Sequence, residues 1–122
     1  MKMTFTIDSF TLNVVDLTET SSPVGAEWHA WENEQIVLKR YIYGIKRTWR
    51  LTCVEKDVAW SNSAARYLQQ KMAAGETVQF SVNEGDRYSL PATTCHIAGL
   101  ELEIEPAGQQ NIRKYVVILR ER

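Results

Sequence analysis

One stretch of the sequence, residues 57–75, has helical periodicity, whereas most of the remainder alternates with the period of a β-strand. Its apolar residues recur along one helical stripe: Trp60, Ala64, Ala65, Leu68 and Met72. Asp57 is a suitable N-cap, Ser61 is a weaker one, and Gly75 lies where a left-handed residue after a helix is preferred. We therefore expect a single amphipathic helix over about 57–74 that covers one side of a β core.

The strand-like segments determine the expected fold class. Alternating or β-branched runs occupy residues 4–14, 36–43, 47–54, 78–82, 96–105 and 114–119. The runs 36–43 and 47–54 are separated by Gly44, which allows a turn or a bulge, so they form either a hairpin or one long bent strand pair. Turns are expected at 83–86 and 106–108. The sequence predicts an α+β fold, mainly antiparallel β: a β-sandwich or barrel-like domain with one flanking helix.

The chain has 122 residues, which is enough for one domain with a hydrophobic core, so we expect a single domain over 1–122. Residues 16–25 are polar and rich in loop-forming types, and 27–33 has no clear pattern. This composition predicts an exposed, flexible loop over about 16–34.

The charge balance argues against a general nucleic-acid-binding protein. Fourteen Lys and Arg residues face 15 Asp and Glu residues, a formal net charge of −1, and a local basic patch remains possible. Apolar runs are far shorter than the roughly 20 residues that cross a bilayer, so we expect no membrane anchor. The N-terminus lacks a signal-peptide core, which predicts synthesis in the cytoplasm.

Catalytic chemistry is not indicated. His29 and His96 are the only histidines, and no metal-ligand spacing, phosphate-binding glycine loop or nucleophile elbow is present. Cys95 and His96 are neighbours in a strand, where they project to opposite faces and cannot form a thiol–imidazole pair. Cys53 and Cys95 are best interpreted as small buried hydrophobic residues. We expect no enzyme activity, no metal and no cofactor.

Residues 39–50 interleave five basic side chains with Tyr41, Tyr43 and Trp49. Basic residues around exposed aromatic rings are how β-sheets hold single-stranded nucleic acid, by phosphate pairing and base stacking. The alternative is that Trp49 belongs to the core and that the arginines are solvated or paired with acids, and the overall charge favours this alternative.

Three glutamates alternate along one strand: Glu101, Glu103 and Glu105. Such a row can be a solvated strand edge that deters aggregation. In a ring-shaped oligomer it would be repeated around the axis, and an acidic lining repels nucleic-acid phosphates. The solvated edge is the simpler interpretation.

The order of several residues resembles small tail proteins of tailed bacteriophages and prophages. The resemblance covers roughly residues 36–122 and rests on these positions: Arg47, Trp49, Leu51, Cys53 and Glu55 in alternation; Trp60 and Gly75 bounding the helix; Val78 and Phe80; His96, Ile97, Gly99 and Leu100; and Tyr115 to Val117, Leu119 and Glu121. Tail tube, tail terminator, distal tail and baseplate proteins share variants of a β-sandwich or barrel-like module with one helix.

The resemblance implies a non-enzymatic virion structural protein that forms homo-oligomeric rings or tubes in a tail, with other tail or baseplate proteins as partners and DNA only passing through. The segment 16–34 would be an inter-subunit arm. Two surfaces would meet between subunits: a basic one, Arg40, Tyr41, Tyr43, Lys46, Arg47 and Arg50, and an acidic one that could also line the lumen, Glu101, Glu103 and Glu105. The alternative function is a small β-rich protein that binds single-stranded nucleic acid through residues 39–50.

Overall fold

The computed structural model describes residues 4–83, 87–104 and 111–122, with the side chains of Ile42 and Tyr43 excepted. Every pair of neighbouring strands is antiparallel. The strands are β1 (Thr4–Ile7), β2 (Phe10–Leu12), β3 (Val14–Glu32), β4 (Gln35–Lys56), β5 (Thr77–Asn83), β6 (Leu90–Ile104) and β7 (Ile112–Glu121).

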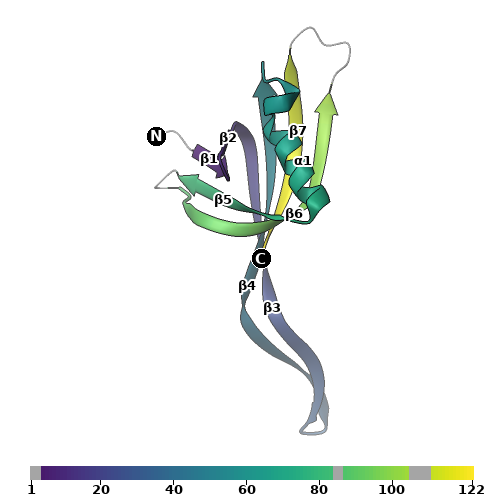
Figure 1. Cartoon of the computed structure of the whole chain (residues 1–122). Helices are drawn as coiled ribbons and strands as arrows, with labels where there is room; N and C mark the ends of the chain where they lie inside the picture. Colours follow the sequence, from purple (N-terminus) through teal and green to yellow (C-terminus); the bar gives the residue numbers. More distant parts are fainter. Residues whose placement is uncertain (1–3, 84–86, 105–110) are drawn as a thin grey trace.

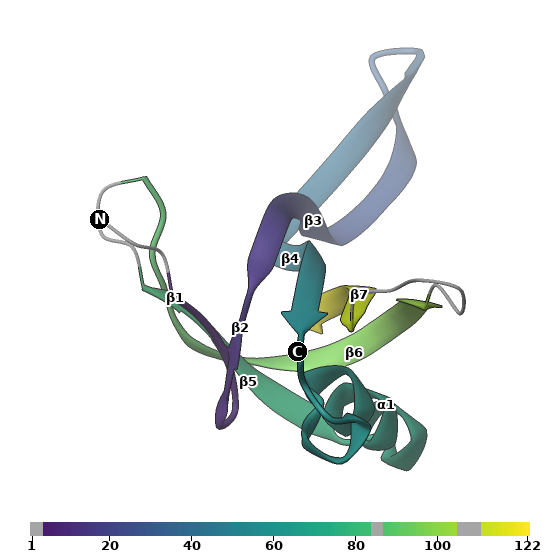
Figure 2. The ribbon, with the colours of Figure 1, turned by 90° about the horizontal axis from the view of Figure 1, so that it is seen from above.

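These strands form one sheet in the order β2-β1-β5-β6-β7-β4-β3. The sheet twists and curls, as Figures 1 and 2 show, with α1 (Ala64–Ala74) against one side. It does not close, because β2 and β3 remain its two edges. The predicted fold class, an antiparallel β domain with one flanking helix, is confirmed. The specific form is a single curled, open sheet.

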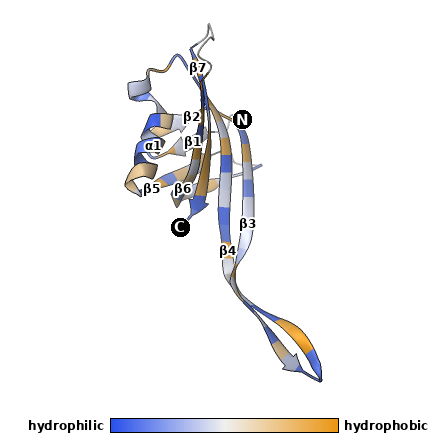
Figure 3. Cartoon of the chain, turned by 90° about the vertical axis from the view of Figure 1, so that its right-hand side faces the viewer, coloured by the Kyte–Doolittle hydropathy of each residue, from blue (hydrophilic) through white to orange (hydrophobic). Residues whose placement is uncertain are grey.

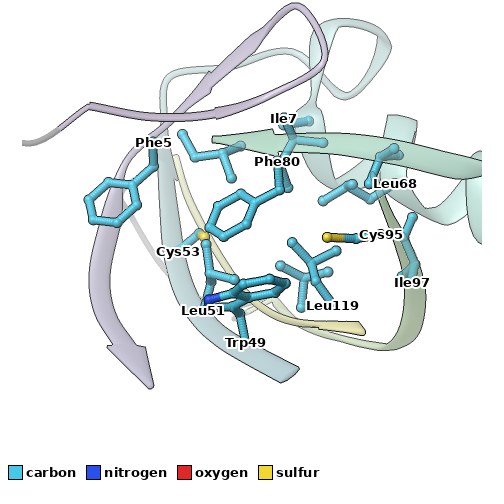
Figure 4. Packing of buried hydrophobic residues seen from close by; sticks show 14 of the residues in the cluster. Phe5, Ile7, Trp49, Leu51, Cys53, Leu68, Phe80, Cys95, Ile97 and Leu119 are labelled. Carbon is cyan, nitrogen blue, oxygen red and sulfur yellow. The ribbon is translucent and has the colours of Figure 1, made fainter. Parts of the chain in front are cut away.

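The hydrophobic core lies on the concave side of the sheet, which we call the core-facing side (Figure 4). Trp49 is fully buried near the centre, and its ring meets that of Phe80 edge-on at 5.5 Å between centroids. Alternate residues of β4, β5 and β7 point into this core, as the period-two pattern predicts. From the helix, the core receives Ala64, Ala65 and Leu68.

The helix begins later than the sequence predicts. A short 3-10 turn, η1 (Trp60–Asn62), precedes α1, and the N-cap is Ser63, whose hydroxyl accepts from the backbone N–H groups of Ala65 and Arg66. Asp57 is not the cap, because β4 runs on to Lys56 and Asp57 itself has a positive φ of 56°. Gly75 ends the helix in the left-handed conformation, as predicted.

The apolar stripe of the helix is also shorter than predicted. Leu68 is fully buried, whereas Trp60 is 40% and Met72 is 37% exposed, so the stripe packs on the core mainly through the first turns of α1. Among the described residues, no helix has the length and apolarity needed to cross a bilayer.

Residues 16–32 form a strand where the sequence predicts a flexible loop. They belong to β3, which pairs with β4 along its whole length. The loop-forming Pro23 is tolerated because β3 is an edge strand, whose outward N–H groups are not needed for pairing. Asn33 and Glu34 connect β3 to β4, and both have positive φ, which is the geometry of a two-residue type I′ turn.

The runs 36–43 and 47–54 are parts of the single long strand β4, not two arms of a hairpin. The predicted irregularity at Gly44 is a β-bulge: Val24 pairs with Gly44 and Gly25 pairs with Ile42, so Tyr43 is the extra residue. The turns predicted at 83–86 and 106–108 fall largely outside the described residues.

Candidate assembly surfaces

The most distinctive feature of the molecule is a two-stranded arm, residues 21–47. Strand β7 pairs with β4 only as far as Thr48, so beyond that point β3 and β4 pair only with each other. The arm projects away from the curled sheet in Figure 1. The β4 strand of the arm has 13 residues, from Gln35 to Arg47, and it extends roughly 40 Å at about 3.3 Å per residue. A two-stranded ribbon of this length has no core of its own.

The arm exposes large apolar side chains near its tip. In Figure 3, where colour gives the hydropathy of each residue, part of the arm near the tip is orange. Cross-strand partners share a side, and odd-numbered residues of β3 share the side of Leu17, which packs on the core. Trp31 and its partner Ile36 therefore lie on a continuation of the core-facing side, and Leu38 follows them. Trp31 is 71% exposed, and nothing in the described molecule covers it. We call these three residues the arm-tip patch.

Two ion pairs join charged residues of the arm. Arg40 donates from Nε to Glu27 Oε1 at 2.7 Å, and Lys39 Nζ lies 2.7 Å from Glu32 Oε1. These pairs are exposed and contribute little to stability. They balance the charge of the arm, so its apolar side chains are its most distinctive binding feature.

Strand β4 is tied to β7 at the root of the arm. The Arg47 guanidinium donates to Glu121 Oε2 at 2.7 Å, and its backbone N–H donates to Oε1 at 3.1 Å. This bonding raises the pKa of Arg47 and lowers the pKa of Glu121. The guanidinium also lies over the Trp49 ring, 5.1 Å from its centroid.

Strand β3 is tied to the body by a second set of bonds. Trp49 Nε1 donates to Glu19 Oε1 at 2.8 Å and to the Tyr88 hydroxyl oxygen at 2.9 Å, and Tyr88 donates to Glu19 at 2.6 Å. Burial, together with the bond to Glu19, raises the pKa of Tyr88 to about 12. Both strands of the arm are therefore anchored where they leave the sheet.

An open groove of about 1020 Å³ lies between the two edges of the sheet. Its walls come from β1 and β2 on one side and from the start of β3 on the other, with Arg87 and Tyr88 at one end. We call it the seam groove. Its apolar lining is formed by Phe5, Leu12, Val14, Val15 and Leu17. Asp16 and Glu19 add negative charge and Arg87 adds positive charge.

The structure does not gather the predicted basic residues on one surface. Arg40 and Tyr41 lie on the arm, where alternation places them on opposite sides, and Arg47 is engaged at the root. Lys46 and Arg50 are exposed on the outer side of β4. The side chain of Tyr43, also predicted for this surface, lies outside the described residues.

Glu101 and Glu103 are exposed on the outer side of β6, and Glu105 lies outside the described residues. Beyond Ile97, β6 pairs only with β7, so this segment is locally an edge, in agreement with the solvated-edge interpretation. Glu103 is directly opposite Lys114. The acidic side chains therefore share their face with a basic one, and the lumen role stays a prediction.

The stacking site predicted for single-stranded nucleic acid lacks its main ring. Trp49 has no exposed surface, and its indole N–H is bonded to Glu19 and Tyr88. Arg40 and Arg47 are paired with Glu27 and Glu121. The alternative interpretation of this segment, a core tryptophan with arginines paired to acids, is confirmed.

The cysteines are buried free thiols, as predicted, and burial raises the pKa of Cys53 to about 12 and that of Cys95 to about 11. His96 is exposed on the opposite face of β6 from Cys95, which confirms that the two do not pair. In the described part of the chain, no group of three His, Cys, Asp or Glu side chains is arranged to hold a metal ion.

Two solved structures resemble this one over most of the chain. A chain of the virion of a native gene transfer agent particle covers 97% of this chain and 90% of its own length, with a TM-score of 0.61 and 13% identity. A chain of the tail of an empty gene transfer agent particle, refined helically with C6 symmetry, covers 91% and 78%, with a TM-score of 0.57 and 11% identity. The chain shares the fold of these two proteins. No family model matches the sequence, and no curated protein matches it.

Sequence reasoning missed the arm as a strand pair and missed the seam groove. One signal was present for the arm: Trp28 and Trp31 precede Asn33, and β-branched residues follow from Ile36. Asn at a two-residue connection favours a type I′ turn, although Glu34 stands where Gly is usual. No local signal marks the groove, because it depends on which strands end up at the sheet edges.

Proposed function

We propose that this protein is a non-enzymatic structural component of a phage-like tail and that copies of it associate into rings or tubes. The uncovered arm-tip patch carries the proposal: a monomer that leaves Trp31, Ile36 and Leu38 in water is expected to bury them against another protein. The shared fold with chains of gene transfer agent virion and tail particles supports the same role.

The other parts of the proposal follow from this role. The protein would reside in the virion tail and contact other tail or baseplate proteins, with DNA only passing through the assembly. Lys46 and Arg50 on one copy would face Glu101 and Glu103 on its neighbour, because each pair is exposed on the outer side of the sheet. Opposite charge at such contacts selects orientation more than it adds affinity.

Size-exclusion chromatography with light scattering tests the self-association directly. We expect the mass to rise with protein concentration above that of the 14.0 kDa chain and electron microscopy to show rings or tubes. A monomer at millimolar concentration, with or without molecular crowding agents, would contradict the proposal.

A further inference from the structure

We propose that the seam groove of one copy is the receptor for the arm-tip patch of a second copy. The inference rests on the proposed self-association and adds to it a specific pair of surfaces. One surface is the patch of Trp31, Ile36 and Leu38, and the other is the groove between β2 and β3.

The arm-tip patch lies on the side of the β3–β4 ladder that faces the core in the body, but the core does not extend to the arm. On the body, the same side of the β3–β4 ladder carries Leu17, Leu51 and Trp49, which pack under the rest of the sheet. On the arm this side carries apolar residues among polar ones, yet β7 has ended and, within the described residues, no other element covers the apolar ones near the tip. Burying such side chains stabilises an assembly by about 25 cal/mol for each Å² removed from water.

The seam groove is an exposed apolar surface of the body that could receive the arm-tip patch. The sheet stops at β2 and β3 without closing, and the groove between these edges exposes apolar lining from both. Val15 is the clearest example: it lies beside the bulge between Val14 and Asp16 and is 61% exposed. The volume of about 1020 Å³ is large enough for several side chains.

The acidic residues of the groove outnumber its one basic residue, Arg87, which makes the groove compatible with a cation on the arm. Asp16 lines the groove and makes no ion pair in the part of the chain that the structure describes. On the arm, Arg40 lies on the same side as the arm-tip patch, next along β4 from Leu38. Its present partner, Glu27, is exposed, so Arg40 can exchange it for a carboxylate at low energetic cost.

The groove must be that of another copy. The arm continues the body strands without a break in pairing, and its root is bonded through Arg47 to Glu121 and through Glu19 to Tyr88 and Trp49. Figures 1 and 3 show it leading away from the sheet. Folding the tip back onto its own groove would break this ladder.

A contact between two different surfaces has a consequence for assembly. Each copy carries one arm and one groove, so the contact is heterologous and repeats from copy to copy, which generates a closed ring or an open helical array. It also means that the two surfaces can be inactivated separately.

A mixing experiment uses this property. Trp31→Glu disables the arm and Val15→Arg disables the groove, and both residues are exposed, so neither change removes a core contact. Losing a buried aromatic anchor weakens an interface by roughly 30-fold or more, so each variant alone should be monomeric where the unmodified protein assembles. A 1:1 mixture should form dimers and nothing larger, because one intact arm meets one intact groove.

The controls are Gln69→Glu and Gln69→Arg, which place the same charges on the exposed surface of α1 and should leave assembly unchanged. Circular dichroism and melting curves establish that all variants are folded. If either surface variant is unfolded, the cysteine variants Trp31→Cys and Val15→Cys replace them, and oxidation of their mixture should give a 1:1 crosslinked dimer.

The outcomes separate the inference from the proposed function. If the unmodified protein assembles and Val15→Arg assembles equally well, the groove is not the receptor and self-association stands. A mixture that stays monomeric also overturns the inference. If the unmodified protein never assembles, the proposed self-association fails and the inference fails with it; binding of the groove to a different tail protein would then be the remaining use of that surface.

Discussion

Individual side chains in this molecule join elements that are distant in the sequence. Ser63 caps α1 and also donates to Glu55 Oε1 of β4 at 2.7 Å, while the Arg113 guanidinium of β7 lies 3.4 Å from the other Glu55 oxygen. A single carboxylate therefore holds the start of the helix against two strands. The sequence offered Asp57 and Ser61 as caps, and the backbone path, which no local pattern reveals, selected Ser63.

Replacing Ser63 with Ala should lower the free energy of unfolding by about 1 kcal/mol, because the backbone N–H groups of Ala65 and Arg66 lose their acceptor. Ser61→Ala is the matched control, since Ser61 is exposed and its side chain does not cap the helix. Urea unfolding of both variants measures the difference. Equal effects of the two substitutions would show that the capping assignment is wrong.

Glu121→Gln should destabilise the protein most at neutral pH. Its bond with Arg47 lowers the pKa of Glu121 below the ordinary value of 4.5. A carboxylate with a depressed folded-state pKa stabilises the fold above its unfolded pKa, and this contribution is lost as the pH falls through the folded pKa. The unfolding free energies of the two proteins should therefore converge below about pH 4.5.

Urea titrations at a series of pH values check this convergence. Glu101→Gln removes the same charge from an exposed position and serves as the control. An offset between Glu121→Gln and the unmodified protein that stays constant down to the acid limit would contradict a role for the Arg47 bond.

At the scale of elements, the body and the β4 strand of the arm were predictable, and the β3 strand of the arm was not. Residues 47–54 and 78–82 alternate strictly because one side of each strand faces the core, and that contrast is visible in the sequence. The arm has solvent on both sides, so its residues carry no such contrast, and the polar run 16–25 resembles a loop. Pairing with β4 makes it a strand, which is a nonlocal cause.

Nonlocal contacts also explain why the engaged basic and aromatic residues could not be predicted from the sequence, whereas the acidic row could. Pairing of Arg47 and burial of Trp49 depend on Glu121 and Tyr88, which are distant in sequence, so a run of basic and aromatic residues could not reveal that half of them are engaged. Glu101 and Glu103 were correctly placed on one exposed face by alternation alone.

Packing of the helix gives a prediction at this scale. Leu68→Ala should cost about 2–5 kcal/mol, the usual price of removing a fully buried leucine side chain from a core. Met72→Ala, one turn further along the predicted stripe, should cost less, about 1 kcal/mol, because Met72 is 37% exposed. Chemical denaturation distinguishes them, and a large loss for Met72→Ala would indicate that the last turn is packed.

At the scale of the whole molecule, the core and the exposed apolar patch of the arm lie in different parts of the chain. Among the described residues, every member of the core cluster lies outside the arm, whose segment 21–47 supplies none of it. The core therefore does not depend on the arm, and we expect the body to be stable without it. Natural proteins rarely leave a long edge strand with exposed apolar residues unless a partner covers it.

Replacing residues 23–45 with an Asn-Gly turn, which joins the paired residues Ser22 and Lys46, should leave a cooperatively folding monomer. The melting temperature should stay within a few degrees of that of the full chain, because no core residue is removed. Light scattering should show that concentration-dependent assembly is lost. A shortened protein that assembles like the full chain would show that the body alone makes the contacts.

The antiparallel ladder of the arm also restricts how such chains can diverge in length. Without a further bulge such as that at Tyr43, one residue inserted in a single strand breaks the register, and one inserted in each strand restores pairing but turns Trp31 to the other side of the ribbon. Only two residues added to each strand, four in all, lengthen the arm while keeping its apolar patch where it is. In relatives that retain this contact, arm lengths should therefore differ in steps of four residues.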